Sequence, residues 1–195
     1  MSGRDHDDFA SLLEAGDADV LAALVTTLPP LAPSAGAWAR LSAATSGGGR
    51  LARFAGQLAA LVDVSVDKAK ELLDRVTDLS SWERDLVPGL DALWVEGGPA
   101  VASCIRGFAR LRAGAPFPVH HHLGDETTLV LEGAMIESGG RVVRPGETLT
   151  MRGDDHAHAY HAAPGGTDLL FFVVVREGIA FEDGARLLHR DPVEP

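Results

Sequence analysis

A cluster of histidines is the feature of this sequence most capable of chemistry. Six of the eight histidines lie between His120 and His161, and three of them are consecutive. In extended backbone, residues i and i+2 point to the same face, so His120 and His122 would direct two imidazoles to one point. A bend over residues 123–125 could bring the carboxylate of Glu126 to the same place. Imidazole and carboxylate are common ligands of Fe, Mn, Ni, Cu and Zn, so this spacing predicts a metal site.

A second histidine group follows later in the chain and could supply a further ligand. His156, His158 and Tyr160 alternate with other residues, so they share one face if the segment is a single regular strand. His161 would then lie on the opposite face. Parity alone therefore does not distinguish His156 from His158.

The elements that must position these side chains change character near residue 85. Before it the pattern is helical, with apolar residues at helical spacing. We expect helices over 8–15, 17–28, 34–44, 50–62 and 66–76. Ser65 is the candidate N-cap of the last helix.

After residue 85 the chain becomes a succession of short β-type runs, interrupted by Gly, Pro and Asp. We expect strands over 90–96, 101–111, 126–132, 134–137, 141–143, 147–151, 157–162 and 169–176. Many short strands with closely spaced turns predict a sandwich or barrel. The run Leu169 to Val175 is apolar on both faces, which indicates a central strand. We therefore expect an α+β chain in two parts: an all-α domain over 1–85 and an antiparallel β domain over 86–180. A loose C-terminal extension over 181–195 would follow.

Composition and charge limit the classes of partner. The net charge is -11 and both halves of the chain are acidic, so we do not expect direct nucleic-acid binding. No apolar run reaches about 18 residues, so no membrane span is expected. The first residues lack the apolar core of a secretion signal, which favours a cytoplasmic protein. Cys104 is the single cysteine, so an intramolecular disulfide is excluded.

The stretch from Gly114 to Gly133 resembles the first cupin motif. Gly114 is followed by five residues, then His120, one residue, His122, three residues, Glu126, six residues and Gly133. The resemblance covers roughly residues 86 to 179 and implies a single β jelly-roll barrel. It also implies one divalent metal ion (Zn, Fe, Mn or Ni), held by these two histidines, the glutamate and a later histidine, which project from two facing strands.

The second cupin motif determines which later histidine is meant, and here the sequence departs from the usual pattern. Gly146 is in place after Pro145, but Gly153 lacks the expected proline two residues before it. Anchoring on Gly153 favours His156. Counting back from the turn at residues 164–166 favours His158, which we take as the expected ligand, with His156 as the alternative.

The order of the two parts resembles the ChrR-type anti-sigma factors, in which a helical domain precedes a metal cupin. The segments that resemble the cupin half of that group are Glu96–Pro99, His120–Glu126 and Arg144–Glu147. In that family the helical domain binds a sigma factor through a fold that holds zinc with a histidine and a Cys-x-x-Cys pair. This chain has no cysteine before Cys104. The resemblance thus implies a sigma factor, or another protein, as partner of a helical domain without that zinc motif.

The resemblance implies two alternative functions. One is a sensor or regulatory module that binds a metal through three histidines and one glutamate. The other is an Fe(II)-dependent cupin dioxygenase that acts on a small chelating substrate such as an enolised diketone; its catalytic residues stay unassigned. Phe117 and Tyr160 are the best aromatic candidates to contact a small-molecule ligand, followed by Met135 and Trp94. Cupins commonly pair through their sheets, which implies a homodimer.

Overall fold

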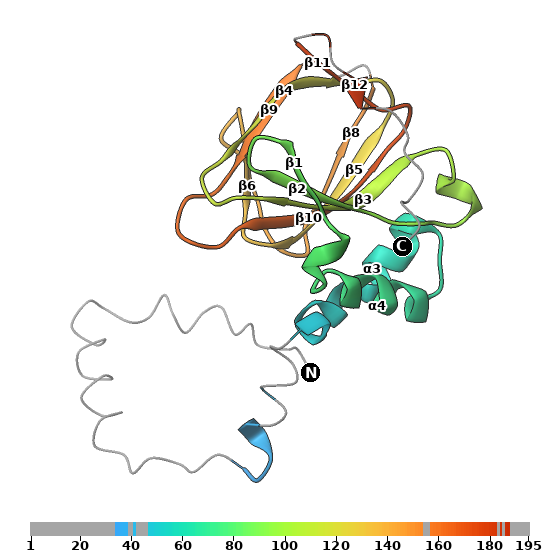
Figure 1. Ribbon diagram of the computed structural model, residues 1–195, viewed down its shortest axis with the longest axis vertical. Helices are drawn as coiled ribbons and strands as arrows, with labels where there is room; N and C mark the ends of the chain where they lie inside the picture. Colours follow the sequence, from blue (N-terminus) through green and yellow to red (C-terminus); the bar gives the residue numbers. More distant parts are fainter. Residues whose placement is uncertain are drawn as a thin grey trace, which may run out of the picture. The chain divides into compact units, whose positions relative to one another are not determined.

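The computed structural model describes residues 34–38, 41, 47–153, 157–182, 184 and 186–187 (Figure 1). The chain divides into two compact units, residues 1–41 and 42–195. In the first unit, the Ala37 amide donates a hydrogen bond of 2.9 Å to the Ser34 carbonyl oxygen. The helices expected over 8–15 and 17–28, and most of the one over 34–44, lie outside the described residues. None of the described helices is long and apolar enough to cross a membrane.

A short helical segment opens the second unit. It comprises the 3-10 helix η3 (Gly47–Phe54), the α-helices α3 (Ala55–Val62) and α4 (Val66–Arg75), and the 3-10 turn η4 (Leu79–Ser81). The predicted cap of α4 is confirmed, because the Ser65 hydroxyl accepts a 3.2 Å hydrogen bond from the Lys68 amide. The helix expected over 50–62 is present as η3 followed by α3.

Two six-stranded sheets follow, and every strand pairing within them is antiparallel. The first sheet has the order β1 (Glu83–Val87), β2 (Leu90–Trp94), β3 (Ile105–Leu111), β10 (Leu169–Val175), β5 (Glu126–Glu132) and β8 (Thr148–Met151). The second has the order β12 (Arg186–Leu187), β11 (Ile179–Phe181), β4 (Pro116–His122), β9 (His158–Ala162), β6 (Met135–Glu137) and β7 (Val142–Val143). The arrangement is a β-sandwich preceded by helices, consistent with the cupin fold, while closure into a jelly-roll barrel stays a prediction.

Each strand region expected from the sequence contains a strand, with shifts at the ends. The region 101–111 begins with the 3-10 turn η5 (Pro99–Val101), so its strand starts only at Ile105. The strand ranges expected from the sequence did not include β1, β4, β11 or β12, although His120 to His122 were expected to be extended. In β1 the residues Glu-Arg-Asp-Leu-Val are mostly polar and half-buried or exposed, as an edge strand allows, and so carry no apolar alternation.

Two hydrophobic cores lie on the two faces of the first sheet. One fills the space between the sheets, and the other lies between the first sheet and the helices (Figure 1). Strand β10 serves both, because Phe171 and Val175 point between the sheets whereas Phe172 and Val174 point to the helices. This explains why the run 169–175 is apolar on both faces, and the predicted central position of the strand is confirmed.

The helices are also joined to the strands by polar contacts. Arg50 of η3 forms an ion pair with Glu132 at the end of β5. The Gln57 side chain donates a 3.0 Å hydrogen bond to the Gly146 carbonyl oxygen. The helices over 47–75 therefore belong to the same compact unit as the sheets. That residues 1–85 form a separate domain, which folds independently of the sheets, stays a prediction.

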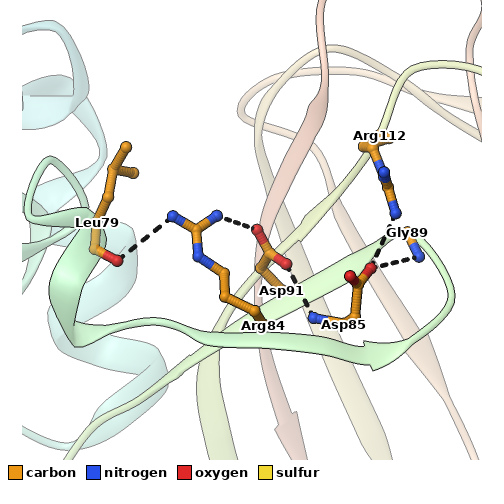
Figure 2. Close-up of polar contacts among 6 residues, drawn as sticks. All are labelled: Leu79, Arg84, Asp85, Gly89, Asp91 and Arg112. Atoms are coloured by element: carbon orange, nitrogen blue, oxygen red, sulfur yellow. Dashed lines mark hydrogen bonds and ion pairs between the residues drawn. The ribbon is translucent and has the colours of Figure 1, made fainter.

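A polar network holds the β1–β2 hairpin at the edge of the first sheet (Figure 2). Asp85 has a left-handed backbone conformation, with φ of 49°. Its carboxylate accepts hydrogen bonds from the Gly89 amide at 3.2 Å and the Arg112 guanidinium at 2.8 Å. The Asp91 carboxylate accepts bonds from the Asp85 amide at 3.1 Å and from Arg84 at 2.5 Å.

Candidate metal centre

Three of the predicted ligands meet in the space between the sheets. His120 and His122 lie on β4, and His158 lies on the neighbouring strand β9, where it pairs with His120. The Nε2 atom of His158 is 3.0 Å from that of His120 and 3.3 Å from that of His122, and the remaining pair is 3.1 Å apart. His120 and His122 are buried, whereas His121 between them is exposed, as the alternation predicts.

A β-bulge in β4 aligns the aromatic and histidine side chains. Phe117 pairs with Tyr160 and His120 pairs with His158, so between these pairs two residues of β4 oppose one residue of β9. The extra residue lets Phe117 and His120 both face the interior, although an odd number of positions separates them. Regular alternation would have turned one of them to solvent.

The fourth predicted ligand comes from the other sheet. Glu126 is the first residue of β5, and its Oε2 atom lies 3.0 Å from Nε2 of His122. Its Oε1 atom accepts a 2.8 Å hydrogen bond from the Thr128 hydroxyl. The expectation of two facing strands is thus wrong in detail, because the histidines share one sheet and only the glutamate faces them from the other.

The turn between β4 and β5 depends on a glycine. A Cβ atom at Gly124 would lie 2.7 Å from the carbonyl oxygen of Arg176, closer than real Cβ contacts allow. The glycine therefore lets the chain pass close to the end of β10 and reverse within three residues. This sharp reversal brings Glu126 back to the histidines on β4.

Hydrogen bonding and burial keep His120 in the form that binds metals. Its Nδ1 atom lies 2.9 Å from the Pro118 carbonyl oxygen, which can only accept, so Nδ1 carries the proton and Nε2 presents its lone pair. Burial lowers the pKa of His120 from 6.5 to about 4, although the Pro118 carbonyl favours the protonated ring. The ring is therefore neutral at neutral pH.

Two other groups of the site have shifted pKa values. Burial alone would raise the pKa of Glu126, but the hydrogen bond from His122 and that from Thr128, with the histidine charges, bring it below its ordinary value. Glu126 is therefore a carboxylate at neutral pH. Burial, and secondarily the negative charge of Glu126, raises the pKa of Tyr160 well above its ordinary value, so its hydroxyl keeps its proton.

The three histidine donor atoms fit a single divalent ion. Among the described residues, the group of donors that all lie within 4.8 Å of one another comprises these three histidines without Glu126, whose role as fourth ligand stays a prediction. The Nε2 atoms of the three histidines are 3.0 to 3.3 Å apart. Such spacing is expected when each donor lies about 2.0–2.2 Å from one ion. A neutral imidazole with its lone pair directed inward and a charged carboxylate are the ligand types that Fe(II), Mn, Ni and Zn accept. The His156 alternative lies outside the described residues.

A largely apolar cavity adjoins this cluster. The volume of the cavity is about 50 Å³. One water molecule needs about 10–15 Å³, so the cavity can hold several waters or a small ligand. Both predicted ligand-contacting aromatics line it, and Phe117 stacks on Tyr160 with the ring centres 4.8 Å apart. Trp94 lines it as well, whereas Met135 is buried in the core between the sheets and does not.

Sequence reasoning missed two contributions to the site. Thr128 supports Glu126 from two positions further along the same strand, a spacing that the sequence displays. Leu86 and Leu90 of the β1–β2 hairpin line the cavity, and no local pattern in the sequence indicates this.

Comparisons with known proteins find likeness in structure alone. No protein-family model matches the chain, and no curated protein matches it. A chain in the crystal structure of Rhodobacter sphaeroides SigE in complex with the anti-sigma ChrR aligns with a TM-score of 0.47 and 21% identity, over 83% of this chain and 77% of that one. An acetylacetone dioxygenase from Acinetobacter johnsonii aligns at 0.47 and 14% identity, over 56% and 80%. The polyketide cyclase RemF from Streptomyces resistomycificus aligns at 0.41 and 22% identity, over 57% and 82%. These likenesses are too weak to carry a functional conclusion.

Proposed function

We propose that this protein is a metal-binding cupin of ChrR type that works as a sensor or regulatory module. It binds one divalent ion through His120, His122, His158 and Glu126. The observation that carries the proposal is the convergence of three imidazole nitrogens from two neighbouring strands, with the Glu126 carboxylate 3.0 Å from one of them. A bound ion there would act as a Lewis acid on an oxygen ligand.

The regulatory role draws support from the position of the helices. Strand β5 begins at Glu126 and ends at Glu132, which pairs with Arg50 of η3. Between these ends, Leu129 and Leu131 point into the core shared with the helices. Strand β5 therefore connects Glu126 at the metal centre with the helices, against which Leu129 and Leu131 pack.

The metal proposal is tested by elemental analysis of untagged protein. We expect about one divalent ion per chain in the wild type, and a loss of at least tenfold in affinity in a His122→Ala variant because one ligand is gone. His121→Ala is the matched control, since its side chain is exposed and points away from the cluster. Equal metal content in His122→Ala and His121→Ala would contradict the proposed site.

The partner proposal is that the helical part binds a sigma factor or another protein. The buried faces of α3 and α4 already pack against the first sheet, so a partner on these helices must use their exposed faces or displace the sheet. A pull-down with the full chain, with metal and after chelation, tests this. Recovery of no protein under either condition would contradict the regulatory role and leave the metal site untouched.

A second candidate function is an Fe(II)-dependent cupin dioxygenase acting on a small chelating substrate of the enolised diketone type. The cavity beside the ligand cluster favours it, because His120 and Glu126 line that cavity. An Fe(II) ion there would supply the redox chemistry by which dioxygen reacts with the substrate. Anaerobic loading with Fe(II), followed by oxygen uptake with chelating diketones, is the test, and no uptake with any of them would remove this candidate.

Two further expectations complete the proposal. We propose a cytoplasmic homodimer that pairs through its sheets, as the cupin resemblance implies. The apolar run of β10 is not available for pairing, because the helices and the second sheet cover its two faces. A solution mass measurement tests the dimer.

A further inference from the structure

We propose that the cavity binds a small, mostly apolar molecule carrying an uncharged carbonyl oxygen, and that the Tyr160 hydroxyl donates the hydrogen bond that orients it. The inference rests on the proposed function only in placing this cavity beside the metal centre. It extends that function by assigning the chemical class of the ligand and a positioning residue.

Tyr160 carries the first step of the argument. Its side chain is only 7% exposed and lines the cavity. Across the described part of the chain, its hydroxyl makes no hydrogen bond, and its oxygen is not among the fully enclosed polar atoms that lack a partner. The hydroxyl therefore keeps accessible surface and is free to donate. A ligand oxygen in the cavity would supply the missing acceptor.

The walls of the cavity select the rest of the ligand. Most of the lining side chains are aliphatic or aromatic, among them Leu86, Leu90 and Phe171. Of the described residues that line it, none is lysine or arginine, and the one acidic group is Glu126. In the metal-free protein, an anionic ligand would meet a carboxylate without a compensating cation. An uncharged oxygen compound with a hydrocarbon body avoids that cost.

The aromatic pair sets where the ligand oxygen would lie. Phe117 stacks on Tyr160 with an interplanar angle of 7°, and Phe171 makes a T-shaped contact with the Tyr160 ring at 6.0 Å between centres. The tyrosine ring is thus held from two sides, and its hydroxyl has a fixed position on the cavity wall. Tyr160 follows the ligand His158 by two residues on β9, so it stands on the same face as the metal centre.

The test uses three probe molecules of similar size with the full-length protein. Cyclopentanone offers a carbonyl oxygen, methylenecyclopentane has the same shape without an acceptor, and butanoate carries a negative charge. Binding is followed by NMR titration of the methyl signals of Leu86 and Leu90, which report on the cavity itself. Each titration is done with zinc-loaded protein and after chelation.

Two variants distinguish the effect of the Tyr160 hydroxyl on ligand binding from that of its ring. Tyr160→Phe removes only the oxygen and keeps the aromatic packing, while His161→Gln on the opposite face of β9 is the matched control. We expect Tyr160→Phe to weaken cyclopentanone binding about 2- to 10-fold, the effect of one hydrogen bond, and to leave methylenecyclopentane unchanged. In the chelated wild type, butanoate should bind more weakly than cyclopentanone.

The outcomes distinguish this inference from the proposed function. If zinc is not retained but Tyr160→Phe still weakens cyclopentanone binding, the inference stands and the metal proposal fails. If zinc is retained but the two proteins bind cyclopentanone equally, the metal proposal stands and the inference is overturned. Tighter binding of methylenecyclopentane than of cyclopentanone by the wild type would also overturn it.

Discussion

At the scale of single residues, burial decides the chemical state of the site before any metal binds. His120 is 1% exposed, and moving a charged imidazolium into that position would cost free energy. The Pro118 carbonyl offsets part of this cost by favouring the protonated ring, yet burial is the larger effect and the pKa falls to about 4. The folded protein thus holds a neutral ligand that the unfolded chain would protonate near pH 6.5.

This difference makes the stability of the metal-free protein depend on pH. Because the folded pKa lies below the unfolded one, the contribution of His120 is complete above about pH 6.5 and is lost as the pH falls toward 4. The loss amounts to about 3 kcal/mol of unfolding free energy, at 1.36 kcal/mol per pH unit. Urea unfolding of chelated protein between pH 4 and pH 7.5 measures it.

A substitution tests whether His120 causes this dependence of the unfolding free energy on pH. His120→Gln should flatten the pH dependence over that interval, whereas His121→Gln, an exposed neighbour on the same strand, should keep it. An unchanged slope in His120→Gln would show that another group carries the effect.

How far the site could be predicted depends on local spacing. His120, His122 and Glu126 stand in one short segment, so strand parity and one turn suffice to bring them together. Phe117 follows no such rule, because its inward direction depends on a β-bulge whose position is determined by pairing with β9. The cavity wall formed by Leu86 and Trp94 depends on which strands are neighbours, which local spacing does not contain.

At the scale of elements, the backbone conformation of Asp85 should contribute more to the stability of the β1–β2 hairpin than the ion pair of its side chain. Asp85 has a left-handed φ of 49°, which Asp and Asn tolerate better than other residues with a Cβ atom. Its pairing with Arg112 is largely exposed, and such pairs contribute about 0–1 kcal/mol. Its side chain also closes the hairpin by accepting the Gly89 amide (Figure 2).

We therefore expect Asp85→Ala to destabilise the protein by about 1–2 kcal/mol, from backbone strain and the lost hydrogen bond. Asp85→Asn should cost less than about 0.5 kcal/mol, because the amide oxygen still accepts from Gly89 and Asn tolerates this conformation. Arg112→Ala serves as the matched test of the ion pair alone. Chemical unfolding of the three variants decides the matter, and equal losses in Asp85→Asn and Asp85→Ala would mean that the charge dominates.

Long-range pairing also explains which strands the sequence did not indicate. The strand β5 was predicted with its observed bounds because a run of β-favouring residues and a closing glycine are both local signals. The short strand β11 forms by pairing with β4, where Ile179 opposes His122 and Phe181 opposes His120. Three residues are too few to display a period, so only the completed sheet defines this element.

At the scale of the whole unit, the two hydrophobic cores share the first sheet as a common wall. The core under the helices contains Leu58 of α3 together with Phe108 and Phe172 of the sheet. Helices as short as α3 and α4 gain most of their stability from such packing rather than from their own hydrogen bonds. We infer that the helices over 47–75 and the sheets unfold together.

Leu58→Ala tests this cooperativity. Leu58 is 0% exposed, so removal of its side chain should lower the unfolding free energy by about 2–5 kcal/mol, whereas Leu79→Ala, at a position 50% exposed, should change it by less than about 0.5 kcal/mol. Thermal unfolding is followed by helical circular dichroism and by tryptophan fluorescence, which includes Trp82 and Trp94. We expect both signals to shift to lower temperature together in Leu58→Ala. If the helical signal is lost first while fluorescence keeps its wild-type transition, the helices form a separate folding unit, as a division near residue 85 would require.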